Sequence, residues 1–186
     1  MQEIIVIVGP TGVGKTKLSI ELAKRLDAEI INGDSVAIYR GLDIGSAKPT
    51  IEEQDGIKHY LIDYICPDER YSVAEYKKDA KKAIKEILEN GKTPIVVGGT
   101  GLYVDSLIYE IEYNDIELDE EYRSYLEEIA SKKGLEYLYD EAMKIDARAM
   151  EKISKNDKKR IIRILEVYQE KEKTKTQQEI ESRQKE

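Results

Sequence analysis

The sequence has little cysteine and histidine, and its aromatic residues are of one kind. Its 186 residues include one cysteine, Cys66, one histidine, His59, and no tryptophan or phenylalanine, so that all 13 aromatic residues are tyrosines. A single thiol excludes an internal disulfide framework and a metal site built from cysteines. His59 lies within an apolar stretch, and we expect it to be structural rather than a catalytic base.

Long apolar runs are also absent. No stretch reaches the roughly 18 consecutive apolar residues of a membrane helix, and the first eight residues lead into a glycine-rich loop instead of a signal-peptide cleavage site. We therefore expect a cytoplasmic protein that does not enter a membrane. The length fits one domain, or one domain with a small appendage, and allows a sizeable core.

The net charge of −8 is unevenly distributed along the chain. Residues 1–143 carry 17 Lys and Arg against 29 Asp and Glu, whereas residues 144–186 carry 13 against 9. An even spread of negative charge would argue against binding to nucleic acid. The basic excess in the C-terminal part leaves two interpretations open, a solvated helix face of mixed charge, which charge alone favours, and a nucleic-acid contact.

A glycine-rich loop between an apolar run and a helical pattern is the strongest local signal. A strand followed by G-x-x-x-x-G-K-T and a helix directs backbone N–H groups, the helix dipole and one lysine onto a phosphate chain. Thr16 is placed to hold a Mg²⁺ ion that bridges phosphate oxygens, whereas the loop does not specify which bond breaks. The loop consists of Gly9, Pro10, Thr11, Gly12, Val13, Gly14, Lys15 and Thr16.

Strand and helix patterns alternate through the first 110 residues. Alternation at these lengths predicts an α/β fold of the P-loop NTPase type, a parallel sheet with helices on both faces. A capping box at Ser72 and a glycine cap at Gly91 bound one of the helices. The expected strands are residues 3–8, 28–32, 59–64 and 94–97, and the expected helices are 15–26 and 72–90.

The chain divides into three predicted parts. Residues 1–110 form the P-loop α/β core, residues 111–143 a helical insertion with a break near 133–134, and residues 144–186 a basic helical segment. Within the last part, Asn156 is the expected N-cap of a helix. The sequence stops inside a polar tract, and we expect a further part of the protein to be absent.

Two side chains at the ends of strands are candidates for catalysis. Asp34 follows the second strand, and open parallel sheets place their ligands at that end. A carboxylate there can accept a proton from a nucleophile aligned with the phosphate chain, and a cap or a loop hydrogen bond is the alternative. Thr100 either donates its hydroxyl to a substrate or caps the helix that it begins. Residues 36–50 are expected to form an ordered active-site loop.

The motifs in this order resemble the tRNA dimethylallyltransferases. The resemblance implies transfer of a dimethylallyl group from its diphosphate to N6 of the adenosine at tRNA position 37, beside the anticodon, with release of pyrophosphate. It implies that Lys15, Thr16 and the loop amides stabilise the leaving diphosphate, that Asp34 takes the N6 proton, and that Thr100 supports the site. The motifs are residues 9–16, 34–35 with 39–49, 59–63, 71–74, 97–103 and 156–167.

The same resemblance implies the partners and the contacts with tRNA. The partners are the anticodon stem-loop of a tRNA, which the helical insertion clamps, and dimethylallyl diphosphate; the cofactor is Mg²⁺, and we expect a monomer. Gly33 differs from the pattern, which more often has alanine there, and Tyr60 replaces a second histidine. The implied tRNA contacts are Asp34, Ser35, Val36, Ala37 and Thr100, together with Lys159, Arg160, Ile161, Ile162 and Arg163.

Three other functions remain open on the sequence alone. A small-molecule kinase explains Lys15 and Asp34 but leaves segments 41–49 and 98–103 unaccounted for. An adenylate isopentenyltransferase that acts on free nucleotides does not explain the helical insertion or the basic helix. A truncated fragment that binds tRNA without turnover is the third alternative.

Overall fold

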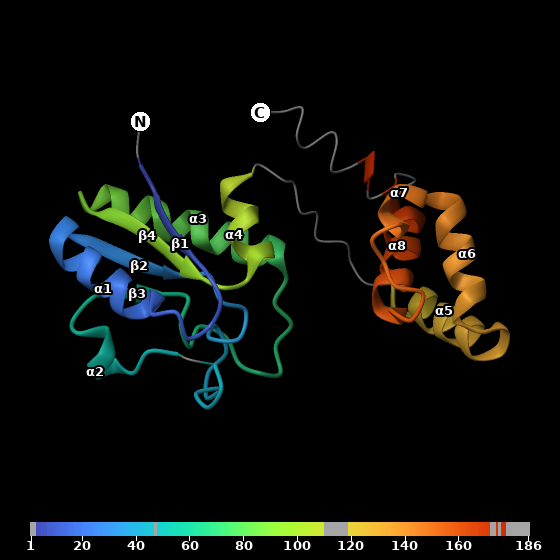
Figure 1. Cartoon of the computed structure of the whole chain (residues 1–186), viewed down its shortest axis with the longest axis horizontal. Coiled ribbons are helices and arrows are strands. Elements are labelled where there is room, and N and C mark those ends of the chain that lie inside the picture. Colours follow the sequence, from blue (N-terminus) through green and yellow to red (C-terminus); the bar gives the residue numbers. More distant parts are fainter. Residues whose placement is uncertain (1–2, 47, 110–118, 172–173, 175, 178–186) are drawn as a thin grey trace. The chain divides into compact units, whose positions relative to one another are not determined.

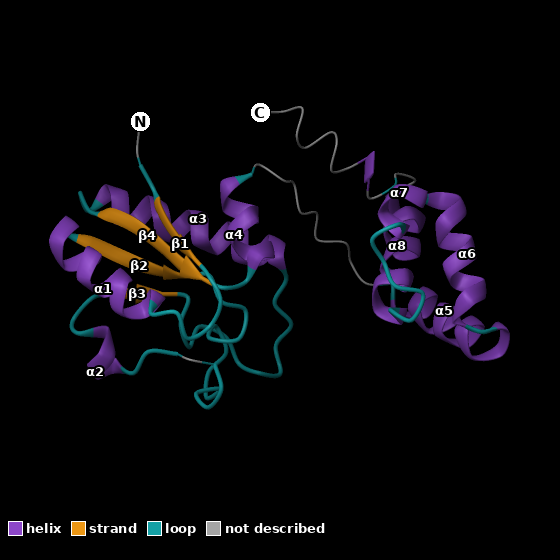
Figure 2. Cartoon of the chain, viewed as in Figure 1, coloured by secondary structure: helices purple, strands orange, loops and turns teal. Residues whose placement is uncertain are grey.

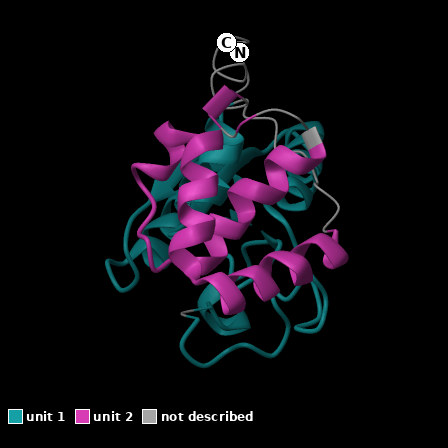
Figure 3. Ribbon diagram, turned by 90° about the vertical axis from the view of Figure 1, so that its right-hand side faces the viewer, with its two compact units in different colours: residues 1–109 teal, residues 110–186 magenta. Residues whose placement is uncertain are grey.

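The computed structural model describes residues 3–46, 48–109, 119–171, 174 and 176–177 (Figure 1). Two compact units divide the chain, Met1–Tyr109 and Glu110–Glu186, which Figure 3 distinguishes by colour. We describe each unit separately. None of the described helices is both long and apolar enough to span a membrane.

The first unit is a parallel sheet covered by helices on both faces (Figure 2). Its strands lie in the order β1-β4-β2-β3, and every pair is parallel. This arrangement confirms the predicted α/β class. The strands are β1 (Ile5–Val8), β2 (Ala28–Asn32), β3 (His59–Tyr60) and β4 (Thr93–Gly98), and the helices are α1 (Lys15–Leu26), α2 (Ile51–Gln54), α3 (Val73–Glu89) and α4 (Gly101–Ile108).

Alternating residues of the central strands form two separate cores. Ile30 and Ile95 pack with residues of α1, whereas Ile31 and Val96 pack with residues of α3. This follows from the pleat, because successive side chains of a strand point to opposite faces of the sheet. Consecutive residues of both central strands, Ile30 and Ile31 in β2 and Ile95 and Val96 in β4, are therefore apolar, as expected for a sheet that is buried on both faces.

The third strand is shorter than predicted. We expected residues 59–64 to be extended, but β3 ends at Tyr60. Leu61 has φ 60° and Asp63 has φ 49°, and both values lie in the left-handed region that only a turn accommodates. The apolar pattern of this segment therefore reflects burial of a turn, of which Leu61 is a part, rather than a long strand.

The helix signals in this unit are confirmed at both ends of α3. Ser72 accepts a hydrogen bond from the backbone N–H of Glu75, and the Glu75 side chain accepts one from the backbone N–H of Ser72, which completes the predicted capping box. Gly91 has φ 75°, the left-handed conformation expected just beyond a helix end.

The second unit is a helical bundle with one shared core. The predicted boundary at 143/144 falls inside α6, and apolar side chains of all four helices pack into a single cluster. Within residues 119–171, the apolar stripes of the predicted insertion and of the C-terminal segment are buried against each other, so these residues fold as one; residues 111–118 of the predicted insertion lie outside the described residues. The helices are α5 (Glu120–Lys133), α6 (Leu135–Ile145), α7 (Ala147–Met150) and α8 (Lys158–Lys171).

The ends of these helices agree with the sequence at one place and differ at another. The predicted break is confirmed at Gly134, whose φ of 87° separates α5 from α6. The prediction that Asn156 is the N-cap of α8 is wrong, because Asp157 Oδ1 accepts the hydrogen bond from the Arg160 N–H at 3.1 Å. Both residues are good caps, and their sequence order does not decide between them.

A buried carboxylate on β2 gives a test of the stability of the first unit. Glu29 on β2 accepts hydrogen bonds from Lys92 Nζ and the Tyr60 hydroxyl, each at 2.9 Å. Burial opposes ionisation most strongly, but the two hydrogen bonds and the charge of Lys92 together lower the pKa of Glu29 below its usual value. A lowered pKa stabilises the fold above the ordinary value of about 4.3, and this contribution is lost as pH falls through the folded value.

We expect Glu29→Gln to lower the free energy of unfolding by about 1–3 kcal/mol at pH 7, because a charged acceptor is lost. The difference from the unmodified chain should shrink as pH falls below the ordinary value of about 4.3 and through the lowered pKa of folded Glu29, because the carboxylate of the folded chain is then protonated. Urea unfolding at several pH values measures both effects. Glu89→Gln is the control, since it removes only an exposed ion pair with Lys85. A deficit independent of pH would show that the ionised form of Glu29 does not contribute.

Candidate active site

The loop after β1 has the geometry that a phosphate chain requires. Gly12 and Gly14 have φ values of 85° and 88°, which turn the chain sharply before α1 begins at Lys15. No acidic residue occupies the first turn of α1, so no carboxylate competes for the positive end of the helix dipole. The Lys15 ammonium lies over the loop and donates hydrogen bonds to the carbonyl oxygens of Gly9 and Pro10 at 2.7 and 2.8 Å.

The Asp34 carboxylate is fixed through one of its two oxygens. Oδ1 accepts hydrogen bonds from the backbone N–H groups of Val36 at 2.8 Å and Ala37 at 3.3 Å. Upstream, the Asn32 amide donates to the carbonyl oxygens of Asp34 and Leu61, and Asn32 Oδ1 accepts from the Asp34 N–H. Both loop contacts use Oδ1, so the orientation of Oδ2 is set by backbone geometry.

The Asp34 carboxylate and the Lys15 ammonium both lie beside the second glycine turn. A Cβ atom placed on Gly99 would lie 4.0 Å from Asp34 Oδ2, 4.0 Å from Lys15 Nζ and 3.3 Å from the Gly9 carbonyl oxygen. The loop, the tip of β2 and the turn after β4 therefore converge on one point. The sequence predicted this convergence from the shared carboxyl ends of parallel strands.

Thr100 connects this turn to the Asp34 loop. Its hydroxyl accepts a hydrogen bond from the Ser35 N–H at 3.0 Å and donates one to Ser35 Oγ at 3.2 Å. Thr100 occupies the N-cap position of α4, but its side chain makes no capping hydrogen bond. The sequence left two roles open for Thr100, and its side chain does not perform one of them, the capping of α4.

Residues of the loop after β1, the tip of β2 and the turn after β4 line a cavity of about 610 Å³ within the first unit, whereas Thr100 is not among its lining residues. Lys15, Thr16 and Asp34 are among its polar lining residues, and Ile20, Ile62 and other apolar side chains also face it. Such a volume suits a small ligand with a charged end and an apolar end.

His59 is a lining residue that the sequence did not associate with the site. Its Nδ1 lies 2.8 Å from the Ile57 carbonyl oxygen, and burial lowers the pKa of the ring despite that hydrogen bond. The neutral imidazole is thereby favoured.

The predicted basic contacts on α8 separate into two kinds. Lys159 and Arg160 are exposed, and Arg163 is half-buried beside Glu166. Ile161 and Ile162 are 0% and 2% exposed and belong to the core of the helical unit, so their side chains cannot reach a tRNA. Five consecutive residues cover more than one turn of a helix, and part of any such run must face inward.

Comparison with known proteins gives the family. The model of the family described as IPP transferase matches residues 37–186. The chain belongs to the IPP transferase family. The resemblance stated from the motifs is therefore confirmed, and the loop at 9–16 precedes the matched range.

Individual relatives of this IPP transferase chain are substantially longer. The tRNA dimethylallyltransferase of Acetivibrio thermocellus is 56% identical over 168 residues, which are 90% of this chain and 54% of that protein. The tRNA dimethylallyltransferase of a Thermoanaerobacter species is 50% identical over 167 residues, 90% of this chain and 53% of the relative. The chain thus spans about half the length of the curated relatives it matches.

Solved structures of IPP transferases agree with the fold. The full-length tRNA isopentenylpyrophosphate transferase of Bacillus halodurans is 47% identical with a TM-score of 0.61, over 92% of this chain and 56% of that one. A eukaryotic dimethylallyltransferase acting on tRNA is 31% identical with a TM-score of 0.78, over 95% and 44% of the two chains.

Proposed function

We propose that the chain transfers a dimethylallyl group from dimethylallyl diphosphate to N6 of the adenosine at tRNA position 37, with release of pyrophosphate. One observation carries this proposal: the Lys15 ammonium and the Asp34 carboxylate face the same point beside Gly99. A cation for a diphosphate and a base for an amine are thereby paired in one cavity. The names of the relatives, tRNA dimethylallyltransferases, support the same reaction.

The proposed step forms one carbon–nitrogen bond, breaks one carbon–oxygen bond and transfers one proton. The exocyclic N6 attacks C1 of the dimethylallyl group, the bond from C1 to the diphosphate oxygen breaks, and Asp34 accepts the proton that N6 loses. Lys15 and the N–H groups of the loop neutralise the charge that develops on the leaving pyrophosphate. N6 of adenine is a weak nucleophile, so its positioning and the removal of its proton matter greatly.

The donor set fits a Mg²⁺ ion that arrives with the diphosphate. In the described part of the chain no group of three or more His, Cys, Asp or Glu side chains is placed to hold a metal. Mg²⁺ commonly keeps few protein ligands and binds mainly phosphate oxygens and water, and Thr16 at the start of α1 supplies a hydroxyl. The ion would neutralise part of the negative charge on the leaving group.

The apolar lining of the cavity supports binding of dimethylallyl diphosphate, and the basic helix α8 supports binding of tRNA. Ile20 and Ile62 line the cavity that also contains the phosphate loop, as the alkyl part of a prenyl diphosphate requires. The adenosine must leave its stack to enter such a cavity. The exposed Lys159 and Arg160 provide contacts to tRNA phosphates. A cytoplasmic monomer remains part of this proposal.

Labelled dimethylallyl diphosphate separates the candidate reactions. The chain is incubated with Mg²⁺, the label and either unmodified tRNA, AMP or no acceptor, and we expect label on adenosine of the tRNA alone. Label on AMP without label on tRNA would assign the reaction to free nucleotides. Phosphorylation of a small acceptor by ATP would favour a kinase, and tRNA binding without transfer would indicate a binding fragment.

Binding to tRNA is expected to depend on salt through α8. The double variant Lys159→Glu, Arg160→Glu should bind tRNA more weakly and reduce the slope of log K against log salt concentration by about 2, because two phosphate contacts are lost. Titrations at several salt concentrations measure this slope. The double variant Lys81→Glu, Lys85→Glu, at two exposed lysines of α3, is the control with the same change in net charge. An equal loss in both variants would remove α8 as a specific contact surface.

A further inference from the structure

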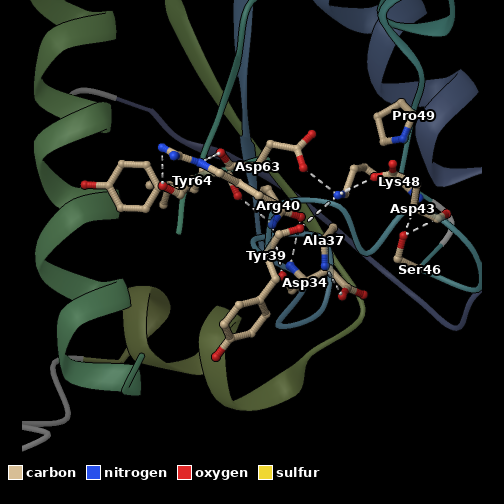
Figure 4. Close-up of polar contacts among 12 residues, drawn as sticks. Asp34, Ala37, Tyr39, Arg40, Asp43, Ser46, Lys48, Pro49, Asp63 and Tyr64 are labelled. Atoms are coloured by element: carbon tan, nitrogen blue, oxygen red, sulfur yellow. Dashed lines mark hydrogen bonds and ion pairs between the residues drawn. The ribbon is translucent and has the colours of Figure 1, made fainter. Parts of the chain in front are cut away.

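A buried lysine organises the loop beside the candidate site (Figure 4). The Lys48 side chain is 4% exposed, and its ammonium donates to the Tyr39 carbonyl oxygen at 2.9 Å, to Asp43 Oδ1 at 2.9 Å and to Asp63 Oδ1 at 2.6 Å. These three acceptors use all three N–H groups of an ammonium. Lys48 therefore has no donor left for a substrate phosphate, although the adjacent Pro49 lines the cavity.

The contact with Asp63 fixes a turn whose backbone is strained. Leu61 and Asp63 both have positive φ, a conformation that residues other than glycine rarely adopt. Asn32 holds the Leu61 carbonyl oxygen at 2.9 Å, and Arg40 donates to the carbonyl oxygens of Asp63 and Tyr64 at 2.9 and 3.1 Å. Of these contacts, the one from Lys48 is made to the side chain of Asp63, whereas the others are made to backbone carbonyl oxygens. The turn is thus held from several sides at once.

The same turn is bonded directly to the loop that holds the candidate base. The Asp63 N–H donates to the Ala37 carbonyl oxygen at 3.3 Å, and the Tyr64 N–H donates to the Ile38 carbonyl oxygen at 2.8 Å. The Ala37 N–H in turn donates to Asp34 Oδ1. A continuous set of contacts therefore runs from the Lys48 ammonium through Asp63 and Ala37 to the Asp34 carboxylate.

The charge of Lys48 is suited to this role. Burial disfavours the ammonium most strongly, but its hydrogen bonds to the Asp63 and Asp43 carboxylates outweigh that effect and raise the pKa of Lys48 above its ordinary value. Without the ammonium, two carboxylates would face each other across the loop with no cation between them. The contacts at Tyr39 and Asp63 would both be lost with a single side chain.

We infer that Lys48 is a positioning residue that holds the 36–39 segment so that Asp34 Oδ2 faces the reacting amine. This inference rests on the proposed function for the amine, whereas the positioning itself concerns only this chain. Lys48 touches neither the phosphate loop nor α1 in any hydrogen bond found for the described residues. Its effect should therefore fall on the proton-removal step and spare the binding of the diphosphate.

The test compares Lys48→Met with Lys92→Met. Lys92 pairs with the buried Glu29, so its loss also removes a cation from a buried carboxylate in the same unit, but away from the Asp34 loop. We expect Lys48→Met to lower kcat by about 10- to 100-fold with KM for dimethylallyl diphosphate changed less than about twofold. Amide hydrogen exchange of Val36 and Ala37 should rise at least about tenfold, while that of the phosphate loop stays unchanged. Lys92→Met should show neither effect.

Each outcome decides one claim. Unchanged exchange at Val36 and Ala37 in Lys48→Met, or a rise equal to that in Lys92→Met, would overturn the positioning role. Absence of transfer by the unmodified chain would overturn the proposed function, and the exchange data would still decide on Lys48. If Lys48→Met does not fold, Asp63→Asn removes the same charge pair with a side chain of equal size. It should raise the exchange of Ala37 in the same direction, and no change there would overturn the inference.

Discussion

Replacement of Asp34 by asparagine is expected to reduce dimethylallyl transfer by about 10²- to 10⁴-fold, the usual contribution of a positioned base. An amide oxygen can still accept the hydrogen bonds from the Val36 and Ala37 N–H groups, so the loop should keep its shape. The amide cannot take the proton that N6 loses. Single-turnover transfer with labelled dimethylallyl diphosphate measures the effect, and equilibrium binding of the diphosphate should remain within about twofold of the unmodified chain, since the Lys15 contacts are intact.

Asp68→Asn is the matched control for this variant. Asp68 is an exposed aspartate of the same unit and does not line the cavity, so the same chemical change there should leave transfer unaffected. Near-normal turnover in Asp34→Asn would assign the proton to another group. A parallel loss of diphosphate binding would instead mean that the carboxylate supports the phosphate loop rather than the amine.

The sequence predicts the convergence of the site because three of its parts follow strand ends. Lys15, Asp34 and Thr100 come after β1, β2 and β4, and in a parallel sheet all carboxyl ends share one edge. The helix limits of α1 and α3 were also predictable, since each begins at a loop or capping box with a strong pattern. Such local signals do not depend on the rest of the fold.

Contacts between distant segments were not predictable in the same way. The pairing of the Thr100 hydroxyl with Ser35 joins residues 65 positions apart, and the Lys48 contact with Asp63 joins residues 15 apart. No spacing rule brings such side chains together, because loop backbone conformation decides their meeting. The burial of Ile161 depends likewise on where the other helices of the bundle lie. The charge and composition of residues 144–186 predicted that α8 is basic, but they did not predict which of its side chains face the core and which face solvent.

Two glycines on either side of one close contact give the second large prediction. A Cβ atom on Gly98 would lie 2.1 Å from the Gly33 carbonyl oxygen and 2.3 Å from its carbonyl carbon, so Gly98→Ala places a methyl group inside the backbone of β2's tip. The Gly33 N–H donates to the Val97 carbonyl oxygen at 2.7 Å, and this contact holds the two strand ends together. We expect Gly98→Ala to lower the free energy of unfolding by about 3 kcal/mol or more, since backbone atoms cannot move aside as a side chain can. Diphosphate binding should weaken as well, because Gly99 and the phosphate loop lie next to the displaced turn.

Gly33→Ala tests the same contact from its other side and should have the opposite sign. A Cβ atom there would meet nothing nearer than 3.4 Å, the distance to Gly98 Cα and to the Val97 carbonyl oxygen, which is ordinary van der Waals contact. The variant should raise the free energy of unfolding by about 0.4–1 kcal/mol, because alanine restricts the unfolded chain. Urea unfolding of both variants, with diphosphate binding measured in parallel, checks the pair. If both substitutions lower the free energy of unfolding equally, the close approach is a property of the whole turn. If the two changes in the free energy of unfolding have opposite signs, the close approach is located at Gly98. The absence of a side chain at Gly98 then lets β2 and β4 bring Asp34 and Gly99 together.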